Sequence, residues 1–211
     1  MIRLVSVSIG FLTVFGAVLA SPVHAQTPQQ RQWCDGQHGV SPDQQISGCT
    51  AIIESARDKP SILATAFNNR AGAYFSQGLF EQAIRDLDQA IRLDPASGSA
   101  LNDRCLSRAT VGQLQEALMD CNNALWLRPG LGRATTLYVR GIVYLKMQQF
   151  VSAIADFDAA LELVPDNASS LYGRGLARLK KGDTAGGNAD IKAAQAIKAD
   201  IADQLARYEV R

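Results

Sequence analysis

Residues 68–95 read NNRAGAYFSQGLFEQAIRDLDQAIRLDP, and this stretch decides the fold because the chain repeats it. Its second half, AIRDLDQAIRLDP, returns as ALMDCNNALWLRP at 117–129 and as AIADFDAALELVP at 153–165. Its first half returns as NDRCLSRATVG, YVRGIVYLKMQ and YGRGLARLKKG, and the arginines of the four copies are 34, 36 and 34 residues apart. A recurring period of this length indicates a stack of similar units.

Each unit contains two apolar stripes with helical spacing. In the first unit, Phe67, Ala71 and Tyr74 fall on one face of a first helix, and Ala83 and Leu87 fall on one face of a second. A glycine separates the two segments in the first, second and fourth units: Gly78, Gly112 and Gly182. Glycine gives the backbone freedom that a tight helix–helix turn needs, and Gln148 takes its place in the third unit. Proline then ends the second helix in three units: Pro95, Pro129, Pro165.

The order of these residues resembles the tetratricopeptide repeat. That family has a large apolar residue, a small residue four positions later, an aromatic residue, then alanine, an apolar residue and a closing proline. The four units match as Phe67, Ala71, Tyr74, Ala83, Leu87, Pro95; Leu101, Cys105, Arg108, Ala117, Cys121, Pro129; Leu137, Gly141, Tyr144, Ala153, Phe157, Pro165; and Leu171, Gly175, Arg178, Gly187, Ile191, Ala199. The fourth unit departs most, because Ala199 replaces the proline.

The resemblance implies an all-α fold, a right-handed α-solenoid of stacked antiparallel helix pairs. No single pair can bury its own apolar face, so stability comes from the contacts between neighbours. We expect an N-terminal capping half-repeat with no full first helix, four units of which the last is degenerate, and an amphipathic C-terminal capping helix with Ile197, Ile201, Leu205 and Tyr208 on its apolar side. The expected ranges are 26–62 for the half-repeat, 63–96, 97–130, 131–166 and 167–199 for the units, and 200–211 for the last helix.

The N-terminus predicts export from the cytoplasm. One cation, an apolar run from Leu4 to Ala20 and small residues at Val23 and Ala25 are typical of a secretory signal at 1–25, cleaved after Ala25. A retained membrane anchor is the alternative, but the run is short for a span and Pro22 follows it. We therefore expect a periplasmic or secreted protein that has no membrane insertion after signal removal.

Composition excludes several functions. The chain has 21 Lys and Arg, 20 Asp and Glu and 2 His, and removing 1–25 takes away Arg3 and His24 and leaves no net charge. Nucleic-acid binding is not expected, because it needs an excess of positive charge. The remaining histidine, His38, lies in a turn-rich segment and has no second histidine for a metal site or a proton shuttle. We expect no metal, no cofactor and no enzyme activity.

Every unit carries an aspartate 16 residues after its arginine. The half-repeat has Gly48 at the aspartate position, so pairing between units would leave Arg70 without a partner, whereas pairing within units leaves none over. We predict four partly buried ion pairs that are structural: Arg70–Asp86, Arg104–Asp120, Arg140–Asp156 and Arg174–Asp190. Arg178, Lys180 and Lys181 then form a small basic patch, which is either a solvated face or a contact for an acidic partner.

Four cysteines in an exported chain favour disulfides, and three connectivities are possible. Cys105 and Cys121 occupy facing positions on the two helices of one unit, so we predict Cys105–Cys121 and Cys34–Cys49. Reduced, buried cysteines are the alternative. A redox site is weakly supported, because the sequence has no C-x-x-C motif.

Resemblance to tetratricopeptide proteins implies a non-catalytic interaction scaffold whose first helices line a concave groove for a peptide or a partner helix. The matching groove positions are Asn68, Phe75, Asn102, Leu106, Tyr138, Leu145, Tyr172 and Leu179. We expect a scaffold that binds a protein or peptide partner and serves envelope assembly or maintenance. A thiol-dependent redox factor or enzyme is the alternative, self-assembly through the end helices is a third, and the oligomeric state stays open.

Overall fold

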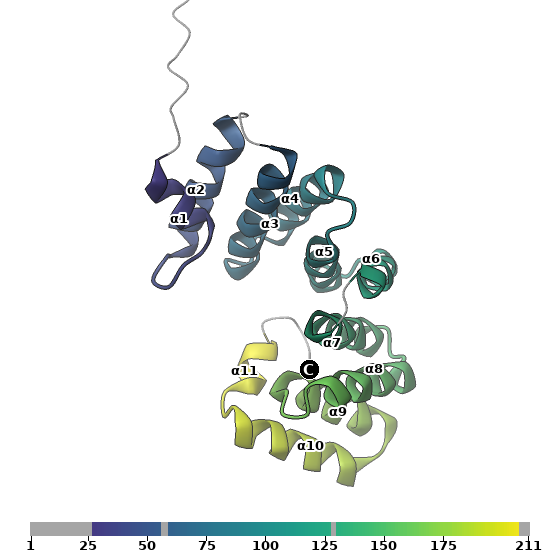
Figure 1. The fold of residues 1–211 in the computed structure, drawn as a ribbon. Helices are drawn as coiled ribbons and strands as arrows, with labels where there is room; N and C mark the ends of the chain where they lie inside the picture. Colours follow the sequence, from purple (N-terminus) through teal and green to yellow (C-terminus); the bar gives the residue numbers. More distant parts are fainter. Residues whose placement is uncertain (1–26, 56–58, 128–129, 207–211) are drawn as a thin grey trace, which may run out of the picture.

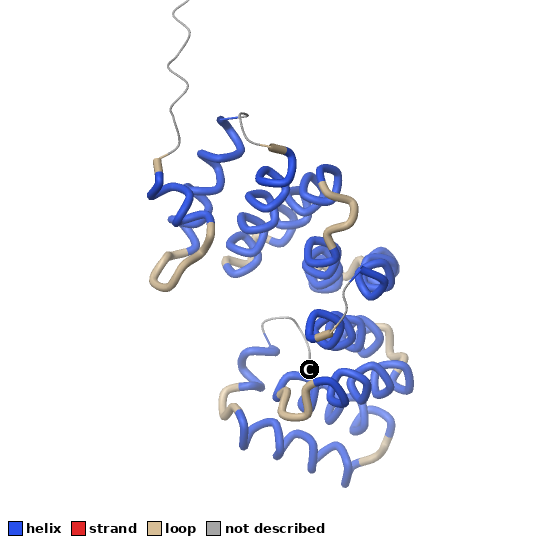
Figure 2. Tube along the Cα trace, viewed as in Figure 1, coloured by secondary structure: helices blue, strands red, loops and turns tan. Residues whose placement is uncertain are grey.

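The computed structural model describes residues 27–55, 59–127 and 130–206. These residues form helices joined by short turns, and no strand occurs among them (Figure 2). The helices are α1 (Pro28–Cys34), α2 (Pro42–Ser55), α3 (Pro60–Ser76), α4 (Phe80–Leu93), α5 (Gly98–Thr110), α6 (Leu114–Leu127), α7 (Leu131–Lys146), α8 (Phe150–Leu163), α9 (Ala168–Lys181), α10 (Thr184–Ile197) and α11 (Ile201–Ala206). The predicted all-α class is confirmed.

Consecutive helices pack in pairs, and the second helix of each pair contacts the first helix of the next. The pairs follow one another along a curve, with α3, α5 and α7 toward its inner side and α4, α6 and α8 toward its outer side (Figure 1). The last helix, α11, turns back and contacts α9 and α10. The predicted stack of helix pairs is therefore present.

Local signals in the sequence set the helix ends. Thr27 and Gln30 form a capping box at the start of α1, in which each side chain bonds the backbone N–H of the other residue. Ser41 and Gln44 do the same before α2. Side chains of Ser97, Asn167 and Asp183 accept backbone N–H bonds at the starts of α5, α9 and α10.

The turns inside the units require a left-handed backbone. Gly78, Gly112 and Gly182 have φ values of 77°, 83° and 95°. Gln148 takes the same place in the third unit with φ 59°, and it is the one non-glycine residue with positive φ in the described part of the chain. A side chain in this conformation is strained, so the sequence departs here from the residue that the turn prefers.

Small residues let the helices approach closely. Ala71 and Ala83 are buried where α3 meets α4, and Ala117 is buried against the Cys105–Cys121 pair. The largest fully buried side chain is Phe157 of α8, whose ring packs against the backbone of Gly141 in α7 and of Gly173 in α9. Three successive helices thus enclose one aromatic ring.

Two disulfides lie inside helix pairs, and both match the predicted pairing. Cys34 is joined to Cys49 across α1 and α2, with a Cα–Cα distance of 4.5 Å. Cys105 is joined to Cys121 across α5 and α6, with a Cα–Cα distance of 5.5 Å. All four cysteines are at most 1% exposed.

The ends of the stack differ in part from expectation. The predicted half-repeat contains a short first helix, α1, because the capping box starts it and the Cys34–Cys49 bond ties it to α2. At the other end, Ile201 and Leu205 of α11 are buried, whereas Ile197 is 51% exposed. The predicted signal at 1–25, Pro129 and Tyr208 lie outside the described residues. None of the described helices has the length and hydropathy of a membrane span.

Candidate functional site

The four arginines at matching positions bond the aspartate of their own pair. Each guanidinium donates through Nε and Nη2 to both carboxylate oxygens, at 2.6 to 2.9 Å. The four carboxylate residues are 3% to 6% exposed. The pairs are Arg70–Asp86, Arg104–Asp120, Arg140–Asp156 and Arg174–Asp190. Such two-point bonds fix the angle between the helices of a pair.

The third nitrogen of each guanidinium, Nη1, reaches back to the preceding helix pair. It bonds Asp88 from Arg104 and Asp158 from Arg174, both at 2.7 Å. In the other two units its partner is neutral: Thr50 at 2.8 Å for Arg70, and Asn122 at 2.7 Å for Arg140. Each arginine therefore joins three helices, a contact between pairs that the sequence analysis did not predict.

Two further arginines add to this network. Arg108 bonds Asp120 and Arg178 bonds Asp190, each at 2.7 Å. The predicted basic patch is therefore wrong in one member, because Arg178 is engaged in an ion pair, whereas Lys180 and Lys181 are exposed. The hydrogen bonds that Arg174 donates to Asp190 and Asp158 raise its pKa above the ordinary value, although burial opposes the shift. Arg108 and Arg178 thus brace the two helices of their own pairs.

A small pocket opens between α3 and α5. Its volume is about 160 Å³, and its walls come from α3, from Leu87 of α4 and from α5: Ala71, Gly72, Phe75, Leu87, Asp103, Leu106 and Ser107. Two predicted groove residues, Phe75 and Leu106, meet in it. Gly72 faces open space, since a Cβ built there would meet no atom within 4 Å. We call it the inner-face pocket.

Two predicted asparagines lie one helical turn before this pocket. Asn68 precedes Gly72 by four residues, and Asn102 precedes Leu106 by four. Asn102 is only 3% exposed; its amide donates to Asp103 at 3.2 Å, and its Oδ1 has no partner among the described residues. The Oδ1 of Asn68 is also buried without a partner. A buried acceptor without a donor costs stability, and neither Oδ1 atom is accessible from the inner-face pocket.

The four other predicted groove residues take part in packing instead. Tyr138 and Tyr172 are half-buried against the core around Phe157, and the ring centroids of Tyr138 and Phe157 are 6.2 Å apart. Leu145 is 8% exposed. Leu179 packs over Gly187, where an added Cβ would lie 2.7 Å from its Cγ. The structure does not bring these residues into the inner-face pocket.

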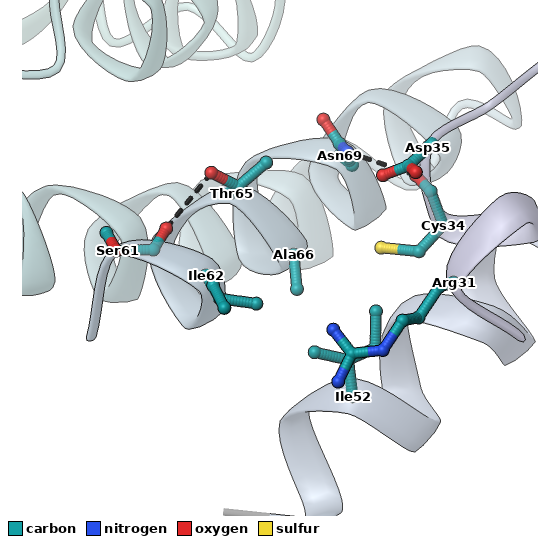
Figure 3. Close-up of a pocket in the computed structure, with 9 residues that line it drawn as sticks. All are labelled: Arg31, Cys34, Asp35, Ile52, Ser61, Ile62, Thr65, Ala66 and Asn69. Atoms are coloured by element: carbon teal, nitrogen blue, oxygen red, sulfur yellow. Dashed lines mark hydrogen bonds between the residues drawn. The ribbon is translucent and has the colours of Figure 1, made fainter. Parts of the chain in front are cut away.

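A larger pocket of about 340 Å³ lies between α1, α2 and α3 (Figure 3). Ile52, Ile62 and Ala66 form its apolar part, and Arg31 and Asn69 lie at its polar edge. Asn69 already donates to the Cys34 carbonyl at 3.0 Å, and this bond ties α3 to α1. The sequence analysis missed this pocket because it did not predict α1.

All four cysteines are bonded in pairs, so none is a free thiol. Among these residues, no three side chains of His, Cys, Asp or Glu gather as a metal site would require. The arrangement consists of packed helices, structural ion pairs and pockets between neighbouring helices.

Comparison with known proteins agrees with the repeat pattern. Residues 64–97 match the family model described as tetratricopeptide repeat, and residues 134–182 match a second model described as TPR repeat. No curated protein matches the sequence.

Solved structures with a similar fold include three proteins of low sequence identity. A MamA protein is 20% identical with a TM-score of 0.61, and the match covers 83% of this chain and 94% of that one. A MamA from Desulfovibrio magneticus RS-1 is 15% identical with a TM-score of 0.64, covering 83% and 98%. YrrB, whose structure is described as a TPR protein with an unusual peptide-binding site, is 17% identical with a TM-score of 0.58, covering 79% and 84%. At these identities the likeness concerns the fold.

Proposed function

Because the chain is a tetratricopeptide-repeat protein, we propose that it is a non-catalytic scaffold that binds a peptide or helix of a protein partner on its inner face. The inner-face pocket between α3 and α5 is the anchor of that site. It carries the proposal because it joins two groove residues, Phe75 and Leu106, in one apolar cavity on the first helices. The peptide-binding site named for YrrB supports the same class of ligand.

The chemistry of the pocket selects its occupant. Phe75, Leu87 and Leu106 offer apolar walls, and at about 160 Å³ the pocket is smaller than a typical small-molecule site of about 300–1,000 Å³. It therefore takes one apolar side chain of a peptide. Asp103 lies at the wall of the same pocket and makes its edge polar.

We place the protein in an oxidising compartment outside the cytoplasm and assign it to envelope assembly or maintenance. Residues 1–25 have the pattern of a secretory signal, and two disulfides inside helix pairs suit such a compartment. The N-terminal residue of the protein recovered from a periplasmic fraction tests this location. An N-terminus at Gln26 supports it, and an intact Met1 in the cytoplasmic fraction contradicts it.

A redox factor remains the alternative function. It needs a thiol that can be reached and that reacts, whereas the four cysteines are at most 1% exposed. That burial favours the scaffold. Fast labelling of one thiol in the native protein after mild reduction would favour the redox factor instead.

The inner-face pocket can be tested by filling it. Leucine in place of Gly72 enters open space on a helix, so Gly72→Leu closes the pocket and leaves the fold intact. Peptides selected from a displayed library for binding to the wild-type protein should contain an apolar residue and bind this variant at least ten times more weakly.

Gln115→Leu is the matched control, because it adds the same side chain at an exposed position of α6 far along the chain from the pocket. Peptides that bind Gly72→Leu as tightly as the wild-type protein would refute the assignment of the pocket.

A further inference from the structure

The junction between the second repeat unit (α5 and α6) and the third (α7 and α8) differs from its neighbours. Helix α7 begins nine residues before its arginine, Arg140, whereas α5 and α9 each begin six residues before theirs. The extra turn carries Arg133, at the position where α5 and α9 have their capping residues Ser97 and Asn167. No side chain caps α7.

The charges at this junction are unbalanced. At the first-to-second junction, Arg104 and Arg108 face Asp88 and Asp120, so charges cancel. The third-to-fourth junction repeats this balance with Arg174 and Arg178 facing Asp158 and Asp190.

At the middle junction, neutral residues replace two of the four charged groups. Asn122 stands in the place of Asp88 and Asp158, and Tyr144 stands in the place of Arg108 and Arg178. Arg140 therefore has Asp156 as its one carboxylate partner among the described residues. Arg133 makes no ion pair in that part of the chain, and its Nη1 donates to the Leu125 carbonyl at 3.3 Å. Arg140 and Asp156 balance each other, so the excess positive charge among the described residues of this junction comes from Arg133.

An open cleft of about 500 Å³ lies beside these two arginines. It is lined by Asn122, Leu125, Trp126, Arg133 and Arg140, and we call it the junction cleft. Trp126 is 91% exposed at a position where the first and third units have Arg92 and Glu162. Met119, seven residues earlier on the same face of α6, is 59% exposed. A flat aromatic ring beside uncompensated positive charge is an arrangement that the other units lack.

We propose that the junction cleft is a second binding site, for an acidic segment of a protein partner. The carboxylate of an Asp or Glu side chain binds the guanidinium groups of Arg133 and Arg140, and an adjacent apolar side chain packs on Trp126. Arginine suits this role because its planar fork of donors matches a carboxylate, and exposed Trp and Arg are common anchors of interfaces. The cleft shares no lining residue with the inner-face pocket, so this proposal does not depend on that one.

Charge distribution favours a peptide over other anionic partners. Among the described residues of the junction the excess is one positive charge, whereas nucleic-acid sites carry extended basic surfaces. The exposed side of α6 beside Trp126 carries Met119, Asn122 and Asn123 and no cation, whereas helices that bind anionic lipid are rich in Lys and Arg. One recessed carboxylate site with an aromatic neighbour fits a single acidic side chain.

The fluorescence of Trp126 reports binding directly. The chain has 2 tryptophans, so Trp33→Phe leaves Trp126 as the only reporter. The probe is a short peptide with blocked ends in which glutamate adjoins leucine. We expect a saturable change in Trp126 emission that weakens with added salt, and at least tenfold weaker binding of the same peptide with glutamine in place of glutamate.

Asn122→Asp is the decisive variant. It gives the middle junction the aspartate of its neighbours, so it pairs Arg140 and cancels the excess charge. We expect at least tenfold weaker peptide binding and an unchanged or raised melting temperature, and Arg133→Gln should weaken binding similarly.

Three outcomes would overturn the proposal. They are equal binding of the glutamate and glutamine peptides, undiminished binding by Asn122→Asp, and a larger Trp126 response to phosphatidylglycerol vesicles or to single-stranded DNA than to the peptide.

Discussion

The same substitution at two helical glycines should have opposite effects on stability. Gly72 of α3 faces open space, whereas a Cβ on Gly173 of α9 would lie 2.6 Å from Cζ of Phe157, where ordinary contacts span 3.4–4 Å. The ring would have to retreat by about 0.8 Å, the difference between 2.6 and 3.4 Å. It is fully buried, and the backbone of Gly141 closes its other side.

The magnitudes follow from two opposing terms. Alanine in place of glycine inside a helix stabilises by about 0.8–1 kcal/mol, and overpacking a filled core costs about 1–3 kcal/mol. Gly72→Ala should therefore gain about 1 kcal/mol, whereas Gly173→Ala should lose up to about 2 kcal/mol, which is the overpacking cost less the helix-propensity gain. For a chain of this size each kcal/mol shifts the melting temperature by about 2–4 °C.

Urea unfolding of both variants and of Gly173→Ala combined with Phe157→Leu measures these terms. The smaller leucine makes room for the new methyl group, so the two changes together should cost less than the sum of the single changes. If Gly173→Ala were as stable as Gly72→Ala, the ring would not be confined between α7 and α9, and this account of the core would be refuted.

Four further variants test the second disulfide, the ion pairs and one turn of the stack. Replacing Cys105 and Cys121 together by alanine opens a 16-residue separation and should lower the free energy of unfolding by about 3 kcal/mol; an unchanged melting temperature would contradict a structural role for the bond. Asp120→Ala leaves two arginines without their buried carboxylate and should lower the free energy of unfolding by about 3–5 kcal/mol. The Asp88 carboxylate is 40% exposed, so Asp88→Ala should lower it by about 0–1 kcal/mol. Urea unfolding that ranks the two variants in the reverse order would disprove this distinction. Gln148→Gly relieves the left-handed backbone and should stabilise by about 1 kcal/mol, and a loss in thermal unfolding would show that the turn is not strained.

The sequence predicts the helix pairs well because its signals are local and repeated. The arginine and aspartate of each unit are 16 residues apart in every copy, and the four ion pairs within units follow from that regularity. The Cys105–Cys121 pair could be matched for the same reason, since the two cysteines occupy corresponding inward positions of one unit.

Contacts between units were harder to foresee because they are not uniform. The third nitrogen of each arginine meets Asp88 and Asp158 in two units but Asn122 and Thr50 in the others, so no strict pattern marks the position. The short helix α1 depends on its capping box and on a covalent tie to α2, and no repeat of the pattern announces it.

The repeat pattern also did not predict which side chains of the inner face are buried. Asn102 and Phe75 were both assigned to the groove, yet one is 3% exposed and the other lines a pocket. The difference arises from how closely neighbouring pairs approach at each junction, and a single sequence does not encode that distance position by position.

The contact that each unit's arginine makes with the preceding unit through Nη1 has a consequence at the C-terminal end of the stack. Asp158 is the acceptor for the arginine of the fourth unit, and the corresponding position of the fourth unit itself is Lys192, an exposed residue of α10. An added unit, whether gained by duplication of the gene or supplied by a second molecule joining end to end, would bring its own arginine against this lysine. Like-charge repulsion would then act at the position where each earlier unit provides an oxygen acceptor, so Lys192 disfavours a further unit in this register.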